Sequence, residues 1–249
     1  MATNEIDLSS SAPVMPFEPV EDALDLAPFE ELIFALEEVR GAKRGSGEVL
    51  LRGDQLMLNR SLEQLELIGD VEVIRDEGQL SSELIRGWLS ESGVLRLLEA
   101  VGDVRVVQGV RVGRGDWLQY DWMEQTVLLR GRASVADSGV ILHGEQFSGR
   151  AGDAGRLVCE PNAWLEWDPL DEAQGGADVR ARQAILNRSD GSVRFEGSVR
   201  VRGVYGALNC EKLMLQLKEV SELDWLRAES GVVFQYGDVM AKAEDMYYK

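Results

Sequence analysis

The chain has 249 residues, of which 44 are acidic and 26 basic, so its formal net charge is −18. Such a charge repels nucleic-acid phosphates and argues against nucleic-acid binding. Hydrophobic residues make up 45% of the sequence, enough for a sizeable core. No apolar run reaches the roughly 18 residues that a transmembrane helix needs, so the sequence predicts no membrane-spanning segment.

The first residues predict a tail rather than a folded unit. Residues 1–24 are rich in Ser, Pro and acids, which is typical of disordered or extended chain. The N-terminus lacks the basic and apolar regions of a signal peptide. Two interpretations stay open: the protein is cytoplasmic, or these residues begin a processed or trimmed chain.

An amphipathic helix is predicted over residues 28–40. Pro28 suits a first helical turn, and Gly41 suits a helix end. Apolar residues follow Pro28 at helical spacing: Phe29, Leu32, Ile33, Leu36 and Val39. So short a helix must dock on something. We expect it to cap the open end of a sheet, with partner binding as the alternative. Residues 41–47 form a basic linker, which gives two predicted regions, 1–47 and 48–249.

Two phased marks recur in the second region. One is a Gly or turn residue before a short β-branched run, at Gly69, Gly102, Gly131, Pro161, Gly197 and Gly231, with steps of 33, 29, 30, 36 and 34. The other is an acid or amide before an apolar pair, at Asp54, Glu83, Asp116, Glu145, Gln183, Glu211 and Glu244. Gly-punctuated alternation of this kind predicts an all-β array of two-stranded units, each about 30 residues long.

Individual segments refine this prediction. The Leu-rich stretch 81–99 resembles a helix, but the phase of the marks favours strands. Residues 168–178 predict an acidic loop, in which Asp168, Asp171 and Glu172 are more typical of a solvated surface than of a Ca²⁺ site. Asp190-Gly191 is the strongest hairpin signal. The last residues, 239–249, begin a seventh unit and stop after one strand, which predicts an open sheet edge.

The sequence offers little for catalysis. His143 is the single histidine, and we expect it to be exposed at a strand end. Cys159 and Cys210 are interpreted as buried free thiols, with a disulfide as the alternative. No phosphate-binding motif is present, and the six tryptophans suggest core or wall residues rather than a sugar platform. We therefore predict a protein without enzymatic activity, catalytic residues, metal or cofactor.

Several motifs resemble the OstA-like family of periplasmic proteins, which includes the lipopolysaccharide-transport proteins LptA and LptC and the N-terminal domain of LptD. The segments GDVEV, GDVRV and GSVRV are followed by RGDQLML, RGDWLQYD, HGEQF, NCEKLML or KAEDMYY. The family pattern is matched best at 112–120 and 240–248, and the resemblance covers residues 48–249. It implies an open β-jellyroll of stacked antiparallel hairpins, in which two facing sheets form an apolar trough for acyl chains. Each buried CH₂ group would contribute about 0.8 kcal/mol.

The resemblance also implies site residues and partners. The expected trough lining is Leu56, Val71, Val73, Val104, Val106, Leu118, Tyr120, Val135, Phe147, Trp167, Val199, Val201 and Leu213. The expected strand-pairing edge contains Met240, Met246 and Tyr248. The implied partners are lipopolysaccharide or a similar amphiphile, and other OstA-like proteins or a second copy, in the periplasm. The net charge and the intermittent arginines depart from what a phosphorylated ligand would favour. The alternatives are a bactofilin-like, self-polymerising β-solenoid with a filled core, and a passive scaffold.

Overall fold

The computed structural model describes residues 49–249, except for 60–62, 76–77, 91–94, 138–139, 151–155, 168–175, 188–189, 205 and 218–222. The predicted tail, the helix over 28–40, the linker and most of the acidic loop lie outside the described residues. Among the described residues, no helix has the length and apolar character needed to cross a bilayer.

The described part of the chain is all-β, as predicted. Its strands are β1 (Val49–Arg52), β2 (Gln55–Asn59), β3 (Gln64–Arg75), β4 (Gly78–Leu89), β5 (Leu95–Gln108), β6 (Arg111–Asp121), β7 (Thr126–Asp137), β8 (Val140–Arg150), β9 (Arg156–Glu160), β10 (Ala163–Trp167), β11 (Ala177–Ala181), β12 (Gln183–Asn187), β13 (Ser192–Gly203), β14 (Gly206–Leu217), β15 (Leu223–Tyr236) and β16 (Val239–Tyr248). The described part of the helix-like stretch 81–99 falls in β4 and β5 except for residue 90, so the strand interpretation is confirmed there. The predicted hairpin at Asp190-Gly191 joins β12 to β13.

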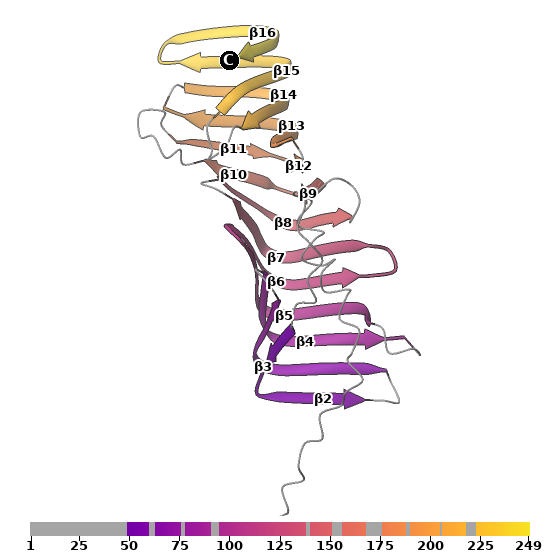
Figure 1. Ribbon diagram of the computed structural model, residues 1–249. Coiled ribbons are helices and arrows are strands. Elements are labelled where there is room, and N and C mark those ends of the chain that lie inside the picture. Colours follow the sequence, from indigo (N-terminus) through magenta and orange to yellow (C-terminus); the bar gives the residue numbers. More distant parts are fainter. Residues whose placement is uncertain are drawn as a thin grey trace, which may run out of the picture.

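The strands form one antiparallel meander stacked in chain order (Figure 1). From β3 to β8 each strand pairs with its sequence neighbour. Beyond β8 two tracks run side by side, one through β10 and β11 and the other through β9 and β12, and both meet again on β13. β1 and β2 pair only with β3, and β16 pairs only with β15, so these strands are the two ends of the array within the described residues.

Most of the sequence marks lie at corners inside long strands, whereas Asp54, Pro161 and Gln183 lie where one strand ends and the next begins. Pairing registers shift between Ile68 and Val71, between Val101 and Val104, and at six comparable points in β4, β6, β7, β13, β14 and β15. Gly102 and Asp103 at one such point have φ of 81° and 42°, as bulged residues often do. Each of these long strands stays continuous and bends at the mark.

Neighbouring corners interlock. The backbone N–H of Asp54 donates to the carbonyl oxygens of Ile68 (3.0 Å) and Gly69 (3.1 Å). A Cβ atom built on Gly69 would collide with the Asp54 carboxylate. The left-handed φ of 78° at Gly69 and this close approach together explain why glycine stands there.

The same close approach of a glycine to a carboxylate recurs at Gly131 and Asp116, and an ion pair is added there. A Cβ atom on Gly131 would lie 2.6 Å from the Asp116 carboxylate. Arg132 donates to that carboxylate at 2.6 Å, and this hydrogen bond holds the pKa of Asp116 below its usual value. The ionised form of Asp116 therefore favours the folded state at neutral pH, and this contribution is lost as the pH falls through the lowered pKa.

The corners divide the array into two facing layers. Layer A contains β1, β10, β11 and the parts of the long strands paired in line with them, such as Val104–Gln108. Layer B contains β2, β9, β12 and the remaining parts, such as Leu95–Val101. Alternate residues of both layers are buried in one hydrophobic cluster. One cavity is lined by both Val106 of layer A and Phe147 of layer B, so the buried face of layer A is turned toward the buried face of layer B.

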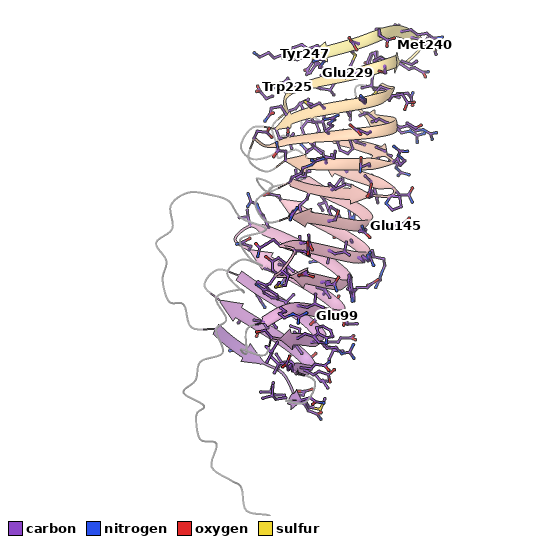
Figure 2. The ribbon with its side chains drawn as sticks, turned by 90° about the vertical axis from the view of Figure 1, so that its right-hand side faces the viewer. Glu99, Glu145, Trp225, Glu229, Met240 and Tyr247 are labelled. Atoms are coloured by element: carbon purple, nitrogen blue, oxygen red, sulfur yellow. The ribbon has the colours of Figure 1, made fainter. Side chains whose placement is uncertain are left out.

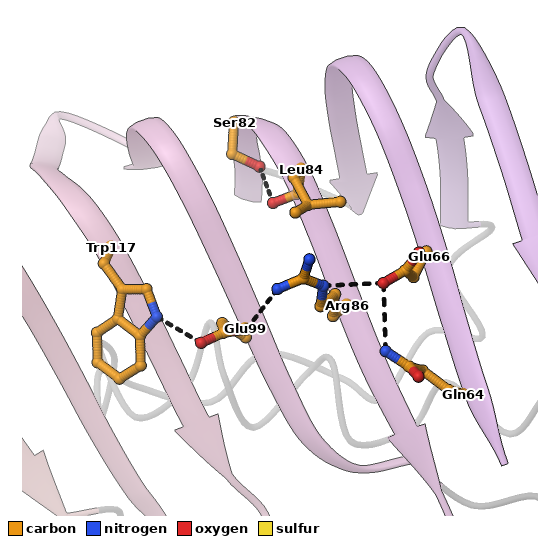
Figure 3. A network of polar contacts seen from close by, with 7 residues as sticks. All are labelled: Gln64, Glu66, Ser82, Leu84, Arg86, Glu99 and Trp117. Carbon is orange, nitrogen blue, oxygen red and sulfur yellow. Dashed lines mark hydrogen bonds and ion pairs between the residues drawn. The ribbon is translucent and has the colours of Figure 1, made fainter. Parts of the chain in front are cut away.

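The outer face of layer B is polar and tied by hydrogen bonds across strands (Figure 3). Arg86 donates to Glu66 at 2.8 Å and lies 3.5 Å from Glu99. The indole N–H of Trp117 donates to the other oxygen of Glu99 at 2.6 Å. This network keeps the charged side chains on the outside, and the interior is left to apolar groups.

Candidate functional site

The interior between the two layers is the candidate functional site. Most of the expected lining residues lie on its walls, and nine of them are at most 6% exposed: Val71, Val73, Val104, Val106, Leu118, Tyr120, Phe147, Val199 and Leu213. Leu165, which the sequence interpretation did not name, is buried in the same cluster. Val135, Trp167 and Val201 are half-buried against that cluster. Leu56 does not belong to the enclosed interior, because it lies on β2 and is 58% exposed.

At some strands burial falls from the corners toward the rims of the layers, where the hairpin turns lie. Ala133, next to a corner, is 1% exposed, whereas Val135 and Val140 farther along β7 and β8 are half-buried. The same holds in layer B, where Ala184 is fully buried and Leu186 only partly. The interior is thus a closed core at the corners and is looser at these rim positions.

A cavity of about 40 Å³ interrupts the core between β5 and β9. Its walls are Val106, Gln108, Arg111, Val112, Gly113, Leu118, Val127, Leu129, Val135, Phe147 and Leu157. All but Gln108 and Arg111 are apolar or glycine. The cavity therefore has an apolar body and a small polar part.

The polar part consists of side chains at the rim of layer A. Gln108 ends β5, Arg111 begins β6, and the two are cross-strand partners. Arg111 Nε donates to an Asp137 carboxylate oxygen at 2.7 Å. Gln108 is 5% exposed, and its side-chain oxygen has no hydrogen-bond partner. Sequence reasoning missed Gln108, because a polar residue directly before a glycine, here Gly109, is typical of a turn and not of an interior.

Glycines control how closely the layers approach one another. A Cβ atom on Gly115 would lie 2.8 Å from both the Arg130 carbonyl oxygen and Leu129 Cδ1. Two residues along the same face of β6, a Cβ atom on Gly113 would meet nothing closer than 3.8 Å. The cavity exists beside Gly113 because no side chain fills that space.

Other arginines of the repeats point away from the interior. Arg105 and Arg114 face each other on the outer side of layer A, and Arg180 and Arg200 do the same farther along. Arg130 lies over the Trp117 ring on the outside of layer B, 5.4 Å from its centroid. Among the cavity-lining residues, Arg111 is the one basic side chain.

His143 lies in the middle of β8 rather than at a strand end, so that expectation was wrong. Its ring stacks on Trp164 at 4.9 Å between centroids, and its Nε2 lies 3.6 Å from Glu166. The cross-strand register places Trp164 beside His143, because Trp164 follows the Pro161 corner in β10. Among the described residues, no group of three or more His, Cys, Asp or Glu side chains is placed to hold a metal ion.

Cys159 and Cys210 are free and buried, as expected. Burial raises the pKa of the Cys159 thiol to about 12 and that of Cys210 to about 11. Both thiols therefore stay protonated at neutral pH, and the thiolate is the reactive form of cysteine.

Both ends of the array expose apolar side chains. On β16, Met240 and Tyr248 are 59% and 63% exposed, whereas Met246 packs partly against the core. On β2, Leu56, Met57 and Leu58 are all exposed. Figure 2 shows Met240 and Tyr247 on the last strand, at the end of the stack.

Comparisons with known proteins give a limited likeness. No family model and no curated protein matches the chain. Among solved structures, one similar chain is LptH of Pseudomonas aeruginosa, the LptA-homologous periplasmic component of the lipopolysaccharide transport device. The two are 18% identical, the match covers 41% of this chain and 74% of LptH, and the TM-score is 0.37.

Proposed function

We propose that this protein is a non-enzymatic carrier that holds the acyl chains of an amphiphile between its two layers. The supporting observation is one apolar interior that runs from β3 to β15 and has half-buried apolar side chains at several rim positions. A bilayer-derived chain gains about 0.8 kcal/mol for each CH₂ group it buries, so an apolar wall is sufficient for binding. The sequence motifs shared with the OstA-like family favour lipopolysaccharide or a similar envelope lipid as the ligand, and the periplasm as the compartment.

Side chains largely fill the interior, so binding requires the layers to separate. Separation is easiest at the rims, where Val135, Trp167 and Val201 are only half-buried. Each of these side chains would exchange contacts with its neighbours for contacts with an acyl chain. The corners, which are fully packed, would act as the hinge.

The two ends support an end-to-end assembly. Edge strands with unpaired backbone groups are templates for strand addition, and both β2 and β16 present such an edge among the described residues. A continuous interior could then extend from one molecule to the next. We expect sedimentation to show concentration-dependent association that Met240→Lys together with Tyr248→Lys reduces. Association that is unchanged by these substitutions would argue against pairing through β16.

Native mass spectrometry tests the binding. The purified chain, incubated with lipopolysaccharide or a fatty acid, is expected to carry the added mass of the amphiphile. Gly113→Leu, which fills the cavity, is expected to lose the adduct. Ser134→Leu adds the same side chain to the outer face of β7 and should keep it.

The alternative of a self-polymerising β-scaffold also predicts a filled interior. If the wild-type chain carries no amphiphile under any of these conditions and still assembles into long polymers, the polymerising β-scaffold is the better account. The transport proposal would then be abandoned.

A further inference from the structure

The side chain of Gln108 is out of place in an apolar interior. Gln108 is only 5% exposed, and its side-chain amide oxygen has no hydrogen-bond partner. An unpaired buried polar group of this kind costs about 1–3 kcal/mol. A leucine of similar size would avoid that cost. Glutamine is therefore favourable at this position only if another group donates a hydrogen bond to its amide oxygen.

The protein itself has little to offer Gln108 at this place. Apart from Arg111, the side chains that line the same cavity are aliphatic or aromatic. The cross-strand neighbours of Gln108 are Gly78 and Arg111. Gly78 has no side chain, and Arg111 directs its Nε to Asp137. The missing partner can therefore come from a molecule that enters the cavity.

We propose that Gln108 and Arg111 form the polar end of the amphiphile site and select acyl chains that carry a hydrogen-bonding group close to an anionic head. This inference rests on the proposed function. Gln108 hydrogen-bonds a hydroxyl or amide group of the ligand. Arg111 faces the anionic head with the guanidinium nitrogens that Asp137 does not engage, while Asp137 holds the guanidinium in place at 2.7 Å.

The register places the two polar side chains next to each other. Directly opposed residues in an antiparallel pair have Cα atoms about 4.5–5.5 Å apart, and Gln108 and Arg111 are such a pair. A 3-hydroxy fatty acid carries its hydroxyl three bonds from the carboxylate carbon, so two neighbouring side chains can contact the hydroxyl and the carboxylate together. From there the chain would run inward along Val106 and Gly113 toward Phe147 and Leu157.

Two ligands of equal length test this inference: a 3-hydroxy fatty acid and the unsubstituted fatty acid. Calorimetry on the full chain is expected to show tighter binding of the hydroxy acid by about three- to tenfold, the worth of one hydrogen bond. Gln108→Leu should abolish this preference and raise the melting temperature of the free protein, since it removes an unpaired polar group. The matched control is Gln79→Leu, because Gln79 faces outward on β4 and bonds Glu72. It should keep the preference.

Contrary results separate the two proposals. If both acids bind the wild type equally, or if Gln108→Leu retains the preference, the selection by Gln108 is wrong and the carrier function stands. A lower melting temperature in Gln108→Leu would show a structural role for the amide, and would also overturn the inference. If neither acid nor lipopolysaccharide binds the wild type, the inference and the carrier function fail together.

Discussion

Phe195→Ala is expected to lower the free energy of unfolding by about 3–5 kcal/mol, as large truncations in protein cores do. Phe195 is fully buried on the inner face of β13, between Ala184 of β12 and Leu213 of β14. Ala184 is too small to move into the space left behind. Thermal and denaturant unfolding measure the loss, and hydrogen exchange should show it first in β12–β14, because repeat arrays respond locally.

The control for this substitution is Arg194→Ala. Arg194 is the adjacent residue of β13 but points outward, where it pairs with Glu196 at 2.7 Å and is 47% exposed. Exposed ion pairs contribute about 0–1 kcal/mol, so this variant should unfold nearly like the wild type. Equal losses for the two variants would mean that the inner and outer faces have been wrongly assigned.

Gly115→Ala and Gly113→Ala are expected to change stability in opposite directions. In Gly115→Ala the new methyl group would press on the Arg130 carbonyl oxygen and on Leu129, both 2.8 Å away. Overpacking of this kind costs about 1–3 kcal/mol. In Gly113→Ala the nearest atoms lie at 3.8 Å, and the loss of unfolded-state freedom should stabilise the fold by about 0.4–1 kcal/mol.

Denaturant midpoints of the two glycine variants give the comparison directly. Both residues lie on the inner face of β6, two positions apart, so strand propensity affects them alike. A stabilising Gly115→Ala would show that the layers are farther apart beside the corner than the structure places them. A strongly destabilising Gly113→Ala would show that the cavity is absent.

The strand content and the position of the corners could be predicted from the sequence, because both leave local signals. Each bulge needs a residue that tolerates positive φ, so marks such as Gly102-Asp103 recur once in each two-stranded unit. The inner residues of each strand follow from alternation around those marks, as Val104 and Val106 do. The same marks could not distinguish a break between strands from a bend within one, since both use glycine and a short polar residue.

The features that were missed depend on pairing between distant strands. Leu56 has the alternation of a lining residue, but it belongs to an end strand with no neighbour on one side among the described residues. His143 acquires its stacking partner only through the register of β8 with β10. Gln108 becomes an interior residue because β5 continues to it and layer B covers it, which no local pattern indicates.

Site-specific photo-crosslinking tests the central claim most directly. A benzophenone amino acid is placed at Leu157, which lines the cavity from β9, and separately at Val158, the next residue, whose alternation places it on the outside of layer B. After incubation with a tagged amphiphile and irradiation, the label is expected on the variant at position 157 and not on the variant at position 158. Labelling at position 158 alone, or equally at both positions, would contradict binding between the layers.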